Sequence, residues 1–429
     1  MKVGKLKVST LALPLVGMVA LLHTSCSDPS GPGNQSNDRI TITNDAPTLA
    51  ARVTYFNDSI PLDTVGVGYS ATAPLGSAPM NRGAAASQAT FNLSLKAEVA
   101  PPSIAGQVLQ ATSVTIVGNL AVVSYNMVGN PYLGAVDVID VTNKNQPVLR
   151  SEALFQNTDV SAVTTSGTDV YLAEATGDTG FTAPAVVEVV HLVGNQLVLT
   201  GNKRAGLTSF AGTSVASGTR VYATSGDGGS LFMIDPVLFT VTNSIPLHDA
   251  RWVAVGGGKV AVVQGTPGTL SVYNESNMSV VGSWAFAGAS VAQSKSQGVI
   301  VGGKAFIAAG DSGVQVLSAS TGTRVGAVPR PNPDSLGLSP SVVVTNSVAI
   351  DQDLLFISNG EAGVYLAQGS QAFSASGPEA PQTITMRGKL RFGNLQSVNH
   401  VAYSAGGPGN PGLLIVAAGL GGLKIVQVN

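Results

Sequence analysis

The stretch Leu413-Leu-Ile-Val-Ala-Ala-Gly-Leu-Gly-Gly-Leu-Lys-Ile-Val-Gln-Val428 decides the fold, because it joins two apolar runs through a glycine-rich turn. The same pattern occurs seven times along the chain, for example as Val170-Tyr-Leu-Ala173 followed by Ala185-Val-Val-Glu-Val-Val190. Such units, repeated every roughly 40 to 60 residues, predict a β-propeller in which each unit forms one blade. An open β-solenoid or a pair of β-sandwiches is the alternative.

The seventh unit, from about 395 to 429, has room for three strands, whereas a propeller blade needs four. The missing strand is available at 91–99, where apolar and polar residues alternate until Pro101-Pro102 ends the run. Pairing it with the last unit would remove the open edges of the ring. We therefore predict an all-β, seven-bladed β-propeller over 91–429, closed by the N-terminal strand 91–99, with its blades over about 111–429.

The composition agrees with this fold class and excludes some functions. The chain has 51 Gly, 23 Pro, 44% hydrophobic and 11% charged residues, which suits strands and tight turns more than long helices. Its formal charge of −2 becomes −5 when Lys2, Lys5 and Lys7 are removed with the leader described next. Without a basic patch to neutralise phosphates, nucleic-acid binding is not expected.

Residues 1–25 have the pattern of a bacterial export signal. Lys2, Lys5 and Lys7 precede an apolar run from Val8 to Leu22, which is shorter than the roughly 20 residues of a membrane-spanning helix. Cys26, the single cysteine of the chain, follows after His23-Thr24-Ser25, where lipoprotein processing would make it the acylated N-terminus. An ordinary secretory signal followed by a chance cysteine is the alternative.

The segment between this signal and the propeller has two parts. Residues 26–38 (CSDPSGPGNQSND) are polar and rich in Gly, Pro and Ser, which predicts a lipidated N-terminus with a flexible tether. Residues 39–90 are expected to be irregular, with strands at Arg39 to Asn44 and Ala51 to Phe56. The protein is expected outside the cytoplasm, as an outer-membrane lipoprotein on the cell surface or the periplasmic side.

The first repeat also carries a family resemblance. Tyr132-Leu-Gly-Ala-Val-Asp-Val-Ile-Asp-Val-Thr-Asn-Lys-Asn-Gln-Pro147 resembles the LVIVD-repeat β-propellers found among bacterial lipoproteins, notably in Bacteroidota, with Asp140 and Pro147 at the motif's Asp and Pro. Asp235 is a partial match, and the later copies lose the acid. The resemblance implies a propeller fold and an envelope location more than it implies an activity.

Acidic residues recur beside glycine in the turns Gly177-Asp178, Gly226-Asp227, Gly310-Asp311 and Gly360-Glu361. Hairpin turns favour such residues, since Gly and Asp tolerate positive φ. Calcium would require several oxygen ligands in one loop, and each loop offers one acid. Gly310-Asp311-Ser312-Gly313 is likewise interpreted as a turn and not as a nucleophile motif, so no metal or cofactor is expected.

Five polar residues mark a candidate binding site at the mouth of the central channel. His248, Asp249 and Arg251 begin the inner strand of the fourth unit, and Asn399 and His400 begin that of the seventh. Inner strands line the channel, where propeller ligands bind. The alternative is that each residue serves its own blade through a cap or a hydrogen bond.

These features predict a lipid-anchored, monomeric propeller that binds or scaffolds another envelope component, either a protein or a glycan. The long loops Asn126 to Gly134, Gly177 to Ala185 and Arg330 to Ser339 are the expected contact sites. An enzyme, such as a hydrolase or lyase working at the channel mouth, is the second hypothesis, and a purely structural envelope protein without a specific partner is the third. The other inner strands are small and apolar, which argues against catalysis.

Overall fold

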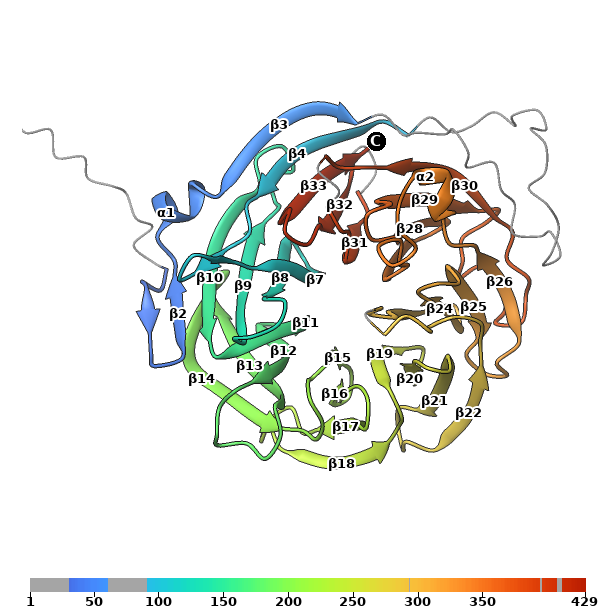
Figure 1. Ribbon diagram of the computed structural model, residues 1–429, viewed down its shortest axis with the longest axis horizontal. Helices are drawn as coiled ribbons and strands as arrows, with labels where there is room; N and C mark the ends of the chain where they lie inside the picture. The colour runs from blue at the N-terminus through green and yellow to red at the C-terminus, as the bar shows by residue number, and fades with distance from the viewer. Residues whose placement is uncertain (1–30, 61–90, 293, 394–395, 407–410) are drawn as a thin grey trace, which may run out of the picture.

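The computed structural model describes residues 31–60, 91–292, 294–393, 396–406 and 411–429 of the chain. The expected signal peptide 1–25, Cys26 and the first part of the tether lie outside the described residues. Within the described ranges, no helix is long and apolar enough to cross a lipid bilayer. The fold is a ring of seven β-sheets, each running from the centre to the rim, so the predicted seven-bladed propeller is confirmed (Figure 1).

Blades 1 to 6 each contain four antiparallel strands whose order along the chain runs from the centre outward. Blade 1 consists of β7 (Gln110–Val117), β8 (Leu120–Asn126), β9 (Leu133–Asp140) and β10 (Val148–Gln156). Blade 2 consists of β11 (Thr158–Ser166), β12 (Asp169–Thr176), β13 (Ala185–Val193) and β14 (Gln196–Gly206). Blade 3 consists of β15 (Ser214–Ser217), β16 (Val221–Thr224), β17 (Ser230–Ile234) and β18 (Val241–Pro246). Blade 4 consists of β19 (Ala250–Gly256), β20 (Lys259–Gln264), β21 (Thr269–Asn274) and β22 (Val280–Ala285). Blade 5 consists of β23 (Gly298–Val301), β24 (Lys304–Ala308), β25 (Val314–Ser318) and β26 (Arg324–Val328). Blade 6 consists of β27 (Ser347–Asp351), β28 (Leu354–Ser358), β29 (Val364–Gly369) and β30 (Ile384–Leu390).

Blade 7 combines both ends of the described chain. Its inner strands are β31 (His400–Ser404), β32 (Gly412–Ala417) and β33 (Leu423–Val428), and β4 (Leu93–Val99) pairs antiparallel with β33. The predicted closing strand at 91–99 is therefore observed as β4. Because the sheet joins early and late residues, the ring closes without an unpaired edge between its first and last blades.

The residues before β4 extend two blades at the rim. The strand β2 (Ile40–Thr43), with β1 (Gln35–Ser36) beside it, pairs with the outer strand β10 of blade 1. After the short helix α1 (Ala46–Ala50), β3 (Val53–Ile60) pairs with β4 on the rim of blade 7 (Figure 1). This N-terminal segment therefore bridges blade 1 and blade 7 from the outside.

Buried charges hold this bridge in place. Arg52 donates two hydrogen bonds to the carboxylate of Asp137, at 2.9 and 2.7 Å, and pairs with Glu152 as well. It also donates to the Ala100 carbonyl oxygen, which follows β4. One guanidinium thus joins blade 1 to the closing strand, and the side chain of Asp137 is fully buried.

Glycines end the recurring turn between the second and third strands for a steric reason. Gly313, Gly363 and Gly422 all have positive φ, at 71°, 88° and 68°. A Cβ there would lie 2.1 to 2.2 Å from the carbonyl oxygen of the last residue of the fourth strand of the same blade, which is β26, β30 or β4. No other residue fits such a position. The interpretation of these turns as scaffold agrees with this geometry.

Apolar side chains fill the space between neighbouring blades. Ala173 and Val187 of blade 2 lie in one buried cluster with Phe232 and Ile234 of blade 3. In the same way, Phe356 of blade 6 packs in a cluster with residues of blade 7. The core is therefore a set of interfaces arranged around the ring, as expected for a repeat architecture.

Candidate functional site

The three loops expected to make contacts lie on one face of the ring. In an antiparallel blade, the turn between the second and third strands leaves the sheet at the same edge as the connection to the next blade. Loops 126–134 and 177–185 are such turns, and 330–339, with α2 (Pro333–Leu336), belongs to a connection between blades. We call this side the connection face.

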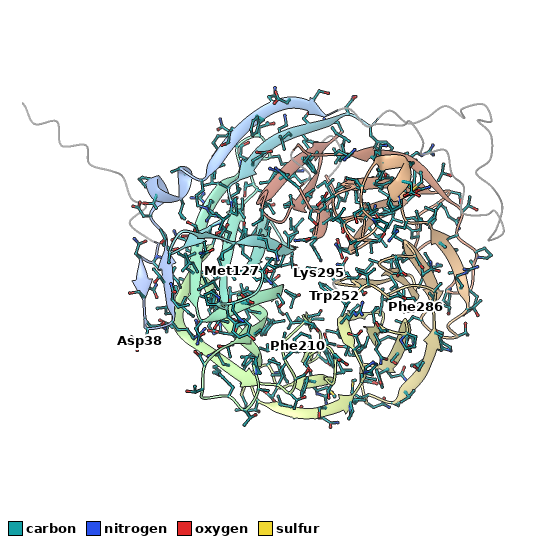
Figure 2. The ribbon with its side chains drawn as sticks, viewed as in Figure 1. Asp38, Met127, Phe210, Trp252, Phe286 and Lys295 are labelled. Carbon is teal, nitrogen blue, oxygen red and sulfur yellow. The ribbon has the colours of Figure 1, made fainter. Side chains whose placement is uncertain are left out.

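The connection face exposes several apolar side chains. Val128 is 72% exposed in the β8–β9 turn, Phe210 is 56% exposed in the connection before blade 3, and Leu420 is 66% exposed in the β32–β33 turn. Figure 2 labels Phe210 together with Met127 and Phe286, which are half-buried and pack against the core. Exposed apolar side chains also lie on the opposite face, where Val237 and Leu238 of the β17–β18 turn are 74% and 69% exposed, so the long loops and not the apolar content distinguish the connection face.

The predicted site residues of blade 4 form two separate pairs. His248 lies at the surface, with its Nδ1 3.2 Å from Oδ1 of Asp227 in the neighbouring turn. Arg251 is buried and pairs with Asp249 at 2.6 Å, and Asp249 adopts a positive φ of 44°. The Arg251 guanidinium also donates to the Val291 carbonyl oxygen at 2.8 Å, so it joins blade 4 to the connection that leads into blade 5.

The predicted residues of blade 7 both contact blade 1. Asn399 donates from Nδ2 to the Ala111 carbonyl oxygen at 2.9 Å, and Nδ1 of His400 accepts a hydrogen bond from the backbone N–H of Val114 at 3.4 Å. His400 is 4% exposed. Burial, together with the nearby charge of Lys295, lowers the pKa of His400 to about 3. The imidazole is therefore neutral at physiological pH.

The contact made by His400 belongs to a series around the ring. In five of the seven neighbouring blade pairs, a polar side chain near the start of one inner strand bonds to the backbone of the next inner strand. Thr112 donates to the Val160 carbonyl oxygen at 2.9 Å. The other four side chains accept from backbone N–H groups: Ser214 from Val253 at 3.3 Å, Gln297 from Val348 at 2.6 Å, Ser347 from Val401 at 2.9 Å, and His400 from Val114 at 3.4 Å. His400 thus has a structural role that Ser, Thr or Gln fills elsewhere.

Two residues absent from the predicted set bring the blades together across the channel. The ring of Trp252, in blade 4, stacks on that of His400, in blade 7, with centroids 5.6 Å apart. Lys295, from the connection before blade 5, donates from Nζ to the Ser161 carbonyl oxygen of blade 2 at 3.0 Å. Figure 2 shows Trp252 and Lys295 beside each other at the centre of the ring. The channel is therefore crossed by side chains.

The sequence did contain signals for both residues. Trp252, one of two tryptophans in the chain, directly follows Arg251, and Lys295 is the single charged residue between Glu275 and Lys304. Stacking between the fourth and seventh units joins the two groups of predicted residues. No hydrogen bond or ion pair links those two groups directly among the described residues.

Other sites in the described part of the chain offer less chemistry. No three His, Cys, Asp or Glu side chains there gather as a metal site. Two cavities, of about 420 and 390 Å³, lie on the face opposite the connection face, one beside Asp351 and Tyr403 and the other beside the turns 117–120 and 192–195. Neither cavity meets the residues of the channel mouth.

Comparison with known proteins supports the fold and nothing finer. No model of a known protein family matches the chain, and no curated protein matches it. A chain of hydrazine synthase from Kuenenia stuttgartiensis shares 13% identity, with 76% of this chain and 99% of that chain covered and a TM-score of 0.54. BamB from Moraxella catarrhalis, at 12% identity over 87% and 99% of the two chains, has a TM-score of 0.45. The computationally designed protein Ika8 covers 76% of this chain at 12% identity, with a TM-score of 0.43.

Proposed function

We propose that this protein is a cell-envelope lipoprotein whose propeller binds or scaffolds a second envelope component, a protein or a glycan, through its connection face. The observation that carries the proposal is that the three long loops 126–134, 177–185 and 330–339 all lie on that face, with Val128 and Phe210 exposed there. A rigid ring that displays loops on one side is suited to binding, and the propeller fold commonly serves it. The resemblance of residues 132–147 to the LVIVD repeat supports an envelope location.

The proposed tether would lead to the rim of the ring. Residues 35 and 36 form β1 at the rim of blade 1, and Leu199 of blade 2 donates its backbone N–H to Oε1 of Gln35. A tether from Cys26 would therefore reach the ring at its rim (Figure 1). The connection face stays free for a partner in this arrangement.

The geometry favours binding over catalysis at the channel mouth. Arg251 directs its guanidinium to Asp249 and to the backbone, and Asn399 bonds to the backbone of blade 1. His400, with its pKa lowered to about 3 by burial and by Lys295, is a weak base at neutral pH. We therefore propose no reaction at these residues.

The contact face is tested with two matched substitutions that border blade 3. Phe210→Asp changes the connection face, and Leu238→Asp changes a side chain that is 69% exposed on the opposite face. Tagged full-length chains are cross-linked in the cells that produce them, and the captured species are compared by mass spectrometry. Phe210→Asp is expected to lose species that the wild type and Leu238→Asp retain. Equal capture by both variants would contradict the proposal.

The anchor is tested independently of the contact face. Cys26→Ala removes the only thiol of the chain, so the variant is expected in the soluble fraction after cell lysis. Cys26→Ser serves as a second variant without an acylated sulfur. Retention of both variants in the membrane fraction would refute the lipoprotein assignment.

A further inference from the structure

The channel mouth contains two cations with different surroundings. Arg251 has a carboxylate partner, because Asp249 accepts from both its Nε and its Nη2 at 3.0 and 2.6 Å. Lys295 has no carboxylate partner among the described residues, and its amine donates to the neutral carbonyl oxygen of Ser161. Since Asp249 compensates Arg251, the positive charge of Lys295 is left uncompensated.

His400 adds a second donor beside this charge. Its Nδ1 accepts from the backbone N–H of Val114, so the neutral imidazole carries its proton on Nε2. That Nε2 is buried and has no hydrogen-bond partner. Trp252 stacks on His400, and Figure 2 shows Lys295 beside Trp252 at the centre of the ring, which places the amine and the imidazole in the same region. The centre of the ring thus holds a buried N–H without an acceptor and an ammonium group whose acceptor is a neutral carbonyl oxygen.

Such a pair of donors requires an acceptor of negative charge. A half-buried cation such as Lys295 without a counter-ion is costly, and the unpaired buried donor of His400 adds to that cost. An anion bound there would relieve both costs at once. The single uncompensated charge matches a monoanion, because a phosphate dianion would bring one more negative charge than the site supplies. The Trp252 indole, stacked on His400, offers an apolar wall for the rest of the ligand.

We propose that the channel mouth binds a carboxylate group of the ligand, with Lys295 as its counter-ion and the Nε2–H of His400 as its second donor. This inference rests on the proposed function, since the ligand reaches the channel from the connection face. The carboxylate belongs either to a small organic acid or to an acidic or C-terminal group of a protein partner. Lys295 leaves the Ser161 carbonyl oxygen to meet it.

The test is a titration of the full-length chain in detergent, with ¹³C-labelled histidine to follow the imidazole of His400 by NMR. Acetate and succinate are titrated against sodium chloride at constant ionic strength. An alanine hexapeptide with a free C-terminal carboxylate is compared with the same peptide carrying a C-terminal amide. We expect a saturable change of the His400 signal with at least one free carboxylate and none with chloride or the amide.

Lys295→Met, with Lys295→Gln as a second variant, removes the counter-ion. Both are expected to bind the carboxylate about tenfold or more weakly, because a contact to a charged group is lost. Lys203→Met is the matched control, since that amine lies at the rim and donates to the Val237 carbonyl oxygen. Binding of acetate or succinate identifies a small acid as the source, and binding of the peptide alone identifies a protein. No saturable change in the wild type, or unchanged affinity in both Lys295 variants, would overturn the inference.

Failure of this inference and failure of the proposed function give different results. If no carboxylate binds while Phe210→Asp still loses captured species, the carboxylate site is wrong and the contact face stands. If Phe210→Asp loses nothing, the proposed contact face is wrong whatever the titration shows. Thermal unfolding of each Lys295 variant confirms that a loss of binding does not reflect a loss of fold.

Discussion

Replacing Arg52 by Met is expected to separate the N-terminal bridge from blade 1. The variant keeps an apolar stem of similar length but removes the guanidinium that contacts Asp137, Glu152 and the Ala100 carbonyl oxygen. The side chain of Asp137 is fully buried and that of Glu152 is 12% exposed. Both carboxylates therefore lose their cation in a place that water barely reaches.

The magnitude follows from this burial. Removing one partner of a buried ion pair costs about 3–5 kcal/mol, because the remaining charge is desolvated and unpaired. Arg150→Met is the matched control in the same blade, since Arg150 is 45% exposed and pairs with Asp140 at 3.1 Å. An exposed pair contributes about 0–1 kcal/mol. The two variants should thus differ by about 3 kcal/mol in unfolding free energy.

The assay combines urea unfolding with hydrogen exchange measured by mass spectrometry. Global unfolding reports the free-energy difference, and exchange in peptides from residues 40–60 and 93–100 reports local opening of the bridge. Adding Asp137→Asn to Arg52→Met should restore part of the loss, because the unpaired charge is removed. Equal losses for Arg52→Met and Arg150→Met, or a loss below about 1 kcal/mol for Arg52→Met, would refute the reasoning.

Three further predictions concern protonation and packing. Burial lowers the pKa of Lys295 from 10.5 to about 8. Below pH 8, Lys295→Met should therefore be more stable than the wild type by up to about 3 kcal/mol, and this difference should vanish as pH rises to 10.5. A stability difference in thermal unfolding that stays constant with pH would contradict this prediction. Burial raises the pKa of Asp159 from 3.8 to about 7. The wild type should therefore lose stability relative to Asp159→Asn as pH rises from about 4 to 7. Melting temperatures of the two proteins that change with pH in the same way would contradict this prediction. Gly412→Ala would place a Cβ 2.0 Å from the Tyr403 hydroxyl oxygen and should lower the unfolding free energy by about 1–3 kcal/mol. Gly377→Ala is the control, because a Cβ there meets no atom within 4 Å and should have little effect. Equal melting temperatures for the two variants would exclude the clash.

The repeats, the turn glycines and the closing strand at 91–99 were predictable because each depends on local pattern. Alternating apolar residues predict a strand wherever they occur, and a three-stranded last unit requires a fourth strand from elsewhere. The use of β2 and β3 to extend blades 1 and 7 was not predictable. Their sequences allow a strand, but the choice of partner depends on which outer edges lie near the chain after the ring has closed.

The candidate site shows the same division. The sequence identified Arg251 and His400 as polar residues at the start of inner strands, where a channel would be. It did not show that Trp252 would stack on His400, or that Lys295 would reach Ser161, 134 positions away. Such contacts cross the ring, so they depend on its diameter and on the rotation of every blade between the two partners.

By itself, the sequence determined the class of the protein: seven strand-turn-strand units, a strand to close them, and a leader whose pattern predicts export. These properties follow from the period of apolar residues and from the backbone freedom of glycine, which act over a few neighbouring residues. Only the tertiary structure decided which charges are compensated. Asp249 lies two residues from Arg251 and neutralises it, whereas the surroundings of Lys295 come from blades that are distant along the chain, and they place no described carboxylate beside it.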